Sequence, residues 1–417
     1  MASLLLAIIY LAFISLGLPD SLLGSAWPEM HQELGVPLSA MGIVTTLISI
    51  GTVASSLMSD RLSKRFPTGI IVSVSVGLTA VGLFGFSIAP EFWVLCLFAI
   101  PYGLGAGAID AALNNYVALH YTSRHMSWLH CFWGVGTILS PYVMSYALGT
   151  ALGWAGGYRI IGGIQAFILI VLVATLPIWK RAGHSAPEKA LALGKTDPSL
   201  GDSAAEASTA SGLPDSPKES RKSAGLIGSL KIRGVPLVLL GFFGYCAAEA
   251  TVMSWSGTYF YETYSLGEEQ AASLGALFFI GMTVGRFASG FISNRLGDKN
   301  MIRLGLGISA VGLILVALPL SLGFAIAGVL LIGLGFAPVY PSIIHATPEN
   351  FGEENSQAII GIQMASAYLG STLAPPIFGL VAEVASTRLL PLYMAVFATL
   401  CFIMLELLFR RKNKRSA

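Results

Sequence analysis

Residues 103–121 read GLGAGAIDAALNNYVALHY and place a carboxylate, Asp110, in the middle of a long apolar segment. Asn114 follows four residues later, so the two side chains share one face of a helix. A carboxylate in the hydrocarbon of a bilayer costs about 3 kcal/mol or more unless it is paired, hydrated or protonated. We therefore expect Asp110 to face a cavity or a partner, and Gly103 and Gly107 to let another helix backbone approach closely. A hydrogen bond that only packs two helices together is the alternative for Asp110 and Asn114.

The composition of the whole chain is typical of a membrane protein. Of its 417 residues, 54% are hydrophobic and only 11% are charged, whereas soluble domains carry about 25% charged residues. The apolar runs are about 20 residues long, which is the length that spans a bilayer as a helix. The four cysteines all fall inside apolar runs, so we expect buried thiols and neither a disulfide framework nor a zinc site. Because no lysine or arginine precedes Arg61, we predict a retained first helix and no cleaved signal peptide.

We predict an all-α membrane protein with twelve transmembrane helices in two six-helix halves. The predicted spans are 4–27, 38–59, 69–89, 92–119, 127–150, 159–179, 234–260, 270–293, 301–319, 322–346, 356–382 and 388–409. The first six belong to an N-terminal bundle, residues 1–182, and the last six to a C-terminal bundle, residues 226–417. Residues 183–225 are rich in Ala, Ser, Gly, Pro and Lys, which predicts a disordered linker.

The basic residues predict the orientation of the helices. With both termini in the cytoplasm, 21 of the 24 lysine and arginine residues fall in cytoplasmic segments, and only Arg159 and Arg388 fall in outer loops. Cytoplasmic loops carry the excess of basic residues in membrane proteins. We therefore expect a multi-pass protein of the plasma (inner) membrane, with both termini and the linker on the cytoplasmic side.

The two halves repeat one another. Residues 51–62 read GTVASSLMSDRL and residues 285–296 read GRFASGFISNRL, and the two align without a gap at an offset of 234. Parallel repeats of this kind occur in transporters whose solute site lies between the halves near the middle of the membrane. The repeat therefore predicts a site between the two bundles.

The segment after Gly51, Asp60-Arg61-Leu62-Ser63-Lys64-Arg65, resembles the loop motif of the major facilitator superfamily, and residues 294–303 resemble its second copy. Within that superfamily the chain is most similar to the fucose permease-like sugar:proton symporters. Three segments carry this resemblance: residues 17–20 (GLPD), Asp110 with Asn114, and residues 333–341 (GLGFAPVYP). The resemblance implies the major facilitator fold and alternating access. Asp110 stands where the fucose permease pattern has Glu, and other relatives of this branch couple to sodium.

Embedded acids are the candidate coupling residues. A carboxylate in a low-dielectric site takes up a proton more readily than one in water, so we expect Asp110 and Asp20 to couple transport to protons. The alternative for Asp20 is a charged helix end near the outer surface. Glu249 is expected to contact solute from the second half, and its alternative is a pair with Arg286.

The candidate substrate-binding residues combine amide, carboxylate and aromatic side chains. Amide and carboxylate groups bond sugar hydroxyls, and aromatic rings cover the apolar face of a sugar. A hydrogen-bonded packing role is the alternative for His130. The full set is Asn114, Asn115, His130, Trp133, Tyr245, Glu249, Trp255, Tyr259, Tyr340, His345 and Gln363.

The candidate gating residues lie at the cytoplasmic ends of the predicted spans. Asp60, Arg61 and Arg65 belong to the loop motif, and Arg295 belongs to its second copy. Arg286 lies two turns inside the eighth span, where we expect it to anchor the inner gate or to extend toward lipid headgroups.

We expect a secondary active transporter that moves a small neutral polar solute, a sugar, by proton-coupled symport. The alternatives are a drug:proton antiporter and a sodium-coupled solute symporter. The sequence contains no G-x-x-x-x-G-K-[ST], HExxH or GxSxG motif, so neither an ATP-driven pump nor an enzyme is supported. No cofactor or metal is expected beyond the coupling ion, H+ or Na+. The expected partners are the solute and the lipid bilayer, with no nucleic acid, and the chain is expected to be a monomer.

Overall fold

The computed structural model describes residues 2–179, 225–318 and 321–416, and every regular element in that part of the chain is a helix. The predicted linker, residues 183–225, lies outside the described residues except for Gly225. The domain boundaries at residues 182 and 226 therefore stay predictions.

The N-terminal half begins with a broken helix. Its elements are α1 (Ala2–Gly17), α2 (Leu22–Glu33), η1 (Leu38–Ala40), α3 (Met41–Arg65), α4 (Thr68–Ser87), α5 (Phe92–His120), α6 (Ser123–Leu148) and α7 (Gly153–Ala174). Between α1 and α2, Pro19 has no N–H to donate and its ring obstructs a continuous helix. The chain turns instead, with the Asp20 N–H bonded to the Gly17 carbonyl at 3.3 Å. The break therefore sets Asp20 at the joint between two helices.

The C-terminal half is also helical, but its first long helix is continuous. Its elements are α9 (Gly225–Leu230), α10 (Val235–Tyr264), α11 (Glu268–Gly275), α12 (Leu277–Ala317), α13 (Leu322–Phe336), α14 (Val339–His345), α15 (Thr347–Phe351), α16 (Glu353–Val384), η2 (Thr387–Leu389) and α17 (Leu390–Ser416). The predicted span 322–346 is divided into α13 and α14 near Pro338.

Ten helical segments of the described residues are long and apolar enough to cross a membrane. One of them, Ser273–Ala317, runs for 45 residues and covers most of two predicted spans, 270–293 and 301–319. It bends at Gly297, whose φ of 72° is available to glycine without strain. The helix α6 has 26 residues, more than the roughly 20 that a bilayer requires, and it corresponds to the predicted span 127–150. The all-α transmembrane architecture is thus confirmed.

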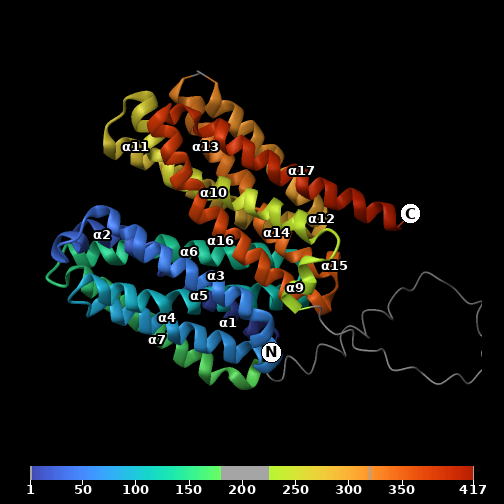
Figure 1. Ribbon diagram of the computed structural model, residues 1–417, viewed down its shortest axis with the longest axis horizontal. Helices are drawn as coiled ribbons and strands as arrows, with labels where there is room; N and C mark the ends of the chain where they lie inside the picture. Colours follow the sequence, from blue (N-terminus) through green and yellow to red (C-terminus); the bar gives the residue numbers. More distant parts are fainter. Residues whose placement is uncertain (1, 180–224, 319–320, 417) are drawn as a thin grey trace, which may run out of the picture.

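The helices of the two halves form two bodies, α1–α7 and α10–α17, that lie apart near α2 and α11 and meet near α9 and α15 (Figure 1). Inside the first body, α5 packs directly on α3. A Cβ added to Gly103 would overlap the Ile48 carbonyl oxygen, and one added to Gly107 would overlap that of Thr52. The predicted close approach at this glycine pair is therefore confirmed.

The end of the bundle at which the halves meet is the end that carries Arg65, Arg124 and Arg295, and we call it the basic end. Polar contacts between the halves gather there. Arg124 Nε donates to the Gly290 carbonyl at 3.2 Å, and Ser356 Oγ donates to Asn115 Oδ1 at 2.5 Å. These contacts close the space between the halves toward the basic end.

Candidate functional site

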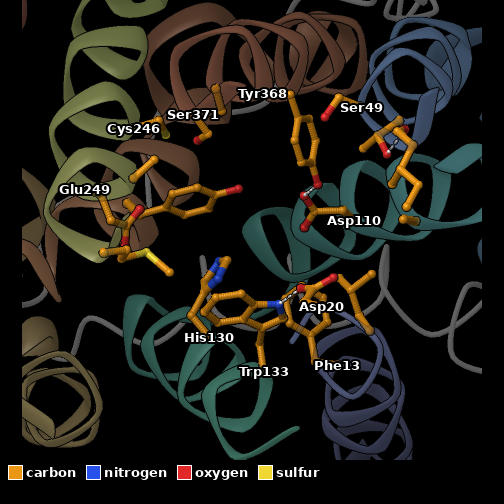
Figure 2. Close-up of a pocket in the computed structure, with 18 of the residues that line it drawn as sticks. Phe13, Asp20, Ser49, Asp110, His130, Trp133, Cys246, Glu249, Tyr368 and Ser371 are labelled. Atoms are coloured by element: carbon orange, nitrogen blue, oxygen red, sulfur yellow. Dashed lines mark hydrogen bonds between the residues drawn. The ribbon is translucent and has the colours of Figure 1, made fainter. Parts of the chain in front are cut away.

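A cavity of about 370 Å³ lies between the two halves. Cavities that bind small molecules measure about 300–1,000 Å³. Its walls come from α1, α3, α5 and α6 on one side and from α10, α12, α14 and α16 on the other. Figure 2 shows carboxylates, aromatic rings and hydroxyl groups from both halves directed into it. The position between repeats is the one that the sequence predicted.

Asp110 is held by hydrogen bonds from both halves. Asn114 Nδ2 donates to its Oδ1 at 2.7 Å, and the Tyr368 hydroxyl of α16 donates to its Oδ2 at 3.0 Å (Figure 2). The Oδ1 of Asn114 lies 3.1 Å from His130 Nε2 on α6. Only 5% of Asp110 and none of Asn114 is exposed. One oxygen of this buried carboxyl group is hydrogen-bonded to each half. A movement of the halves relative to one another therefore changes the hydrogen bonding of the group.

Asp20 faces Asp110 across the cavity from the break between α1 and α2. Its Oδ2 accepts a hydrogen bond from Trp133 Nε1 at 2.8 Å (Figure 2), and its Oδ1 accepts one from the Tyr102 hydroxyl at 3.4 Å. The residue is exposed to the cavity, so it does not lie at an outer helix end. The broken helix and the indole together aim this carboxylate at the centre of the bundle.

The third acid, Glu249 on α10, pairs with Arg286 on α12 at 3.2 Å. The Tyr245 hydroxyl donates to the same oxygen, Glu249 Oε1, at 3.0 Å. Arg286 also spans the halves, because its guanidinium lies 5.1 Å from the centre of the Trp133 ring and its Nη1 is 3.4 Å from the His130 carbonyl. Removing one partner of such a buried pair leaves a charge without compensation, which is costly.

The expected extension of Arg286 toward lipid headgroups is wrong. The residue is only 3% exposed and lines the cavity. Of the other predicted gating residues, Asp60 is buried and pairs with Lys64 at 2.6 Å. Arg61, Arg65 and Arg295 are exposed at the basic end, and their gating role stays a prediction.

The charges around the cavity are unequal. Three acids, Asp20, Asp110 and Glu249, line it together with one cation, Arg286. Within residues 2–179, 225–318 and 321–416, Arg286 pairs with Glu249, and neither Asp20 nor Asp110 forms an ion pair. Two carboxyl groups of the cavity wall are thus held by hydrogen bonds and not by a cation.

Aromatic residues cover the cavity wall next to these acids. The ring of Tyr340 on α14 lies edge-on to His130, with centroids 4.6 Å apart. Phe13 of α1 packs edge-on against the other side of His130, at 5.4 Å. The predicted substrate-binding residues that line the cavity are His130, Trp133, Glu249 and Tyr340.

Other predicted substrate-binding residues lie outside the cavity wall. Trp255 donates to the Pro375 carbonyl at 3.0 Å, and Tyr259 to the Val316 carbonyl at 2.8 Å, so both side chains tie helices together within the second half. Gln363 accepts a bond from Thr347 at 3.0 Å. Two of these residues donate hydrogen bonds to cavity acids, Asn114 to Asp110 and Tyr245 to Glu249. Two others form hydrogen bonds between the halves at the basic end, Asn115 and His345.

Six polar cavity residues were not predicted from the sequence: Ser49, Thr52, Tyr102, Ser254, Tyr368 and Ser371. The available signal for Tyr368 was a tyrosine surrounded by small residues in an apolar run, Ala365-Ser366-Ala367-Tyr368. Small neighbours leave space around a large polar side chain, which is typical of a helix that faces a cavity.

Solved structures of two symporters share this fold. The chain is similar to the E. coli fucose:proton symporter FucP in its outward conformation, with a TM-score of 0.73 and 15% identity. The similarity covers 97% of this chain and 98% of FucP. It is also similar to the proton:xylose symporter XylE bound to 6-bromo-6-deoxy-D-glucose, with a TM-score of 0.74 and 13% identity over 97% and 95% of the two chains. Identities this low establish the shared fold alone.

Sequence relatives extend over nearly the whole chain. An uncharacterized transporter of Sinorhizobium fredii, y4wD, is 26% identical over 394 residues, which cover 91% of this chain and 92% of that protein. Bypass of stop codon protein 6 of Saccharomyces cerevisiae is 24% identical over 409 residues, which cover 95% and 79%. The sequence profile of one family matches residues 9–359 and 238–417. The chain belongs to the Major Facilitator Superfamily.

Proposed function

We propose that this multi-pass membrane transporter moves a small neutral polar solute, a sugar, by proton-coupled symport. The observation that carries the proposal is the pair of carboxyl groups, Asp20 and Asp110, which face one cavity beside Trp133 and without ion pairs among the described residues. Carboxylates accept hydrogen bonds from sugar hydroxyls, and an indole ring covers the apolar face of a sugar. FucP and XylE, which share the fold, are symporters of sugars and protons.

The charge of the cavity favours a neutral solute. An anion would meet three acids and one arginine that is already paired. A lipophilic drug would displace water from these carboxyl groups without offering hydrogen bonds of its own, and removing water from a charged group is costly. A polyol satisfies both the acids and the rings.

Asp110 is the proposed proton site and Asp20 the second coupling acid. Alternating access moves ion and solute together when the charge of the site differs between the outward and inward states. Asp110 bonds to Asn114 in its own half and to Tyr368 in the other, so a movement of the halves changes the stability of its charged form. The chain is proposed to carry out this cycle as a monomer.

A screen for solutes tests the proposal. Purified protein in detergent is heated with sugars, polyols, amino acids and lipophilic drugs, and each compound that raises the melting temperature is then tested for counterflow in proteoliposomes. Stabilisation and counterflow by sugars or polyols would support the proposal. Stabilisation by lipophilic drugs alone, with drug efflux driven by protons, would replace it with antiport.

The orientation is proposed from the basic residues: the basic end faces the cytoplasm, and the cavity is closed on that side. Ser39 and Asn300 are exposed at opposite ends of the bundle. In a chain without its native cysteines, we expect Ser39→Cys to react with an impermeant thiol reagent added to intact cells, whereas Asn300→Cys should react only after lysis. The reverse pattern would refute the orientation.

Replacing Trp133 should weaken solute binding. Trp133→Phe removes the N–H that holds Asp20, and losing a hydrogen bond to a charged group should weaken binding about tenfold. Trp255→Phe is the matched control, because its indole bonds the Pro375 carbonyl outside the cavity. Titration of the solute against both purified variants measures the difference. Equal losses in the two variants would argue against the proposed site.

A further inference from the structure

A second group of polar contacts, which includes the titratable residues His345 and Asp298, joins the halves at the basic end. It consists of His345 at the end of α14, Asp298 on α12, Ser123 at the start of α6 and Tyr121 in the link between α5 and α6, and we call it the gate cluster. His345 Nδ1 lies 2.6 Å from Asp298 Oδ2, and His345 Nε2 lies 3.1 Å from the Tyr121 carbonyl oxygen. Ser123 Oγ donates to Asp298 Oδ1 at 2.6 Å. Two residues of each half thus meet at the end where the two bodies converge (Figure 1).

The partners of His345 determine how many protons the cluster holds. A carbonyl oxygen only accepts hydrogen bonds, so Nε2 must carry a proton to bond Tyr121. The contact at Nδ1 then needs a second proton, either on the imidazole or on the Asp298 carboxyl. On whichever atom it lies, the pair holds one proton more than a neutral imidazole beside an ionised carboxylate.

We propose that the Asp298–His345 pair is a proton-binding site of the transporter, distinct from the cavity acids, that fills when the basic end closes and empties when it opens. If the imidazole carried a single proton, that proton would lie on Nδ1 and bond Asp298. Nε2 would then present a lone pair to the Tyr121 carbonyl oxygen, which cannot donate a hydrogen bond. Loss of the proton therefore removes the bond that His345 makes to the other half. The site depends on alternating access, which the fold supplies, and on neither the proposed solute nor the ion that drives its uptake.

The surrounding groups favour the proton at this position. Asp298 of α12 and Glu349 of α15 are the charged groups that act on His345, and both are acidic. Tyr121, in the link between α5 and α6, contributes its carbonyl. The adjacent cation, Arg124 of α6, is directed at the Gly290 carbonyl and the Trp128 ring. On the same helix, His125 bonds the Tyr10 hydroxyl.

The direction of the pH effect follows from linkage. The closed state holds one proton more than the open state, so raising the pH on the side of the basic end shifts the population toward opening there. For one linked proton, the ratio of closed to open molecules changes at most about tenfold per pH unit. The proton is therefore released to the side on which the basic end opens.

Distance measurements between the halves at different pH values test the proposal without any solute. Spin labels at Pro67→Cys and Asn300→Cys report the separation at the basic end, since both positions are exposed and belong to different halves. In a chain that lacks its native cysteines and is otherwise intact, we expect the fraction of molecules with a short distance between the labels to fall as the pH rises. His345→Gln keeps a donor for the Tyr121 carbonyl but does not titrate, so it should remove the part of this pH dependence that the gate cluster contributes and make the remaining dependence shallower.

His120→Gln is the matched control, because His120 at the same end bonds the Tyr116 carbonyl of its own helix; its pH dependence should match that of the unmodified chain. Asp298→Asn, which removes the negative partner, should move the midpoint to lower pH, and it carries the test if His345→Gln does not fold. An unchanged pH dependence in His345→Gln, or an unchanged midpoint in Asp298→Asn, would overturn the proposal. If these variants behave as expected but no sugar is transported, only the proposed solute is wrong.

Discussion

Asp110→Asn is expected to reduce uphill solute uptake to the level of liposomes without protein, while counterflow exchange stays measurable. The amide imitates the protonated acid and can still bond Asn114 and Tyr368. Exchange of solute requires no net movement of protons, so it survives the substitution, whereas accumulation requires the proton to leave. Uptake and counterflow in the same proteoliposomes, with an imposed pH gradient, measure the two activities.

A surface acid supplies the control for this experiment. Glu383 is an exposed carboxylate on α16, outside the cavity wall, and Glu383→Gln should accumulate solute like the unmodified chain. In that chain, uptake should rise as the outside is made more acidic than the inside, and Asp110→Asn should lose this dependence. Accumulation by Asp110→Asn with the original pH dependence would show that another group couples transport.

The same experiment separates protons from sodium. If uptake follows an imposed sodium gradient and ignores pH, Asp110 is better interpreted as a sodium ligand. Asp110→Asn would then weaken the dependence on sodium concentration, because an amide oxygen is a poorer ligand for a cation than a carboxylate. The carboxyl group is essential in both cases, but the ion that it carries differs.

The transmembrane architecture could be predicted because the bilayer imposes it. Only helices satisfy every backbone group within hydrocarbon, so apolar runs of about 20 residues identify spans. The interruptions were harder to place. Pro19 ends a helix, whereas Pro101 and Pro141 lie inside α5 and α6. Neighbouring helices decide whether the freed carbonyls are satisfied, and a single sequence does not contain that information.

The candidate site was predicted in part. Acids in apolar runs identified Asp20, Asp110 and Glu249, because such groups are expensive in a membrane unless they face a cavity or a partner. The aromatic residues were less certain, since Trp133 faces the cavity and Trp255 does not. Which face of a helix meets the opposite half depends on its rotation in the bundle. Rotation follows from packing over the whole length of the helix, which the local pattern does not fix.

A close approach between α16 and α3, which belong to different halves, depends on a glycine that the sequence did not single out. Gly361 of α16 lies against α3, and a Cβ added there would overlap the Ser56 carbonyl oxygen and crowd Ser59 Oγ. Ser56 itself bonds the Gly107 carbonyl at 3.2 Å, so α3 is held from behind by α5. A side chain at residue 361 can therefore be accommodated only if the halves separate.

Gly361→Val is expected to hold the basic end open and to reduce solute uptake at least about fivefold. Overpacking costs about 1–3 kcal/mol, which corresponds to a shift of about 5- to 150-fold away from the state closed at the basic end. The spin-label distance between positions 67 and 300 should lengthen, and solute binding from the opposite side should weaken because the cavity opens there less often. Gly163→Val is the control, since Gly163 on α7 is exposed and nothing lies within 4 Å of its added Cβ. A folded Gly361→Val protein with the original distance and full uptake would show that α16 and α3 can yield without opening the transporter, and that this glycine does not control the closed state.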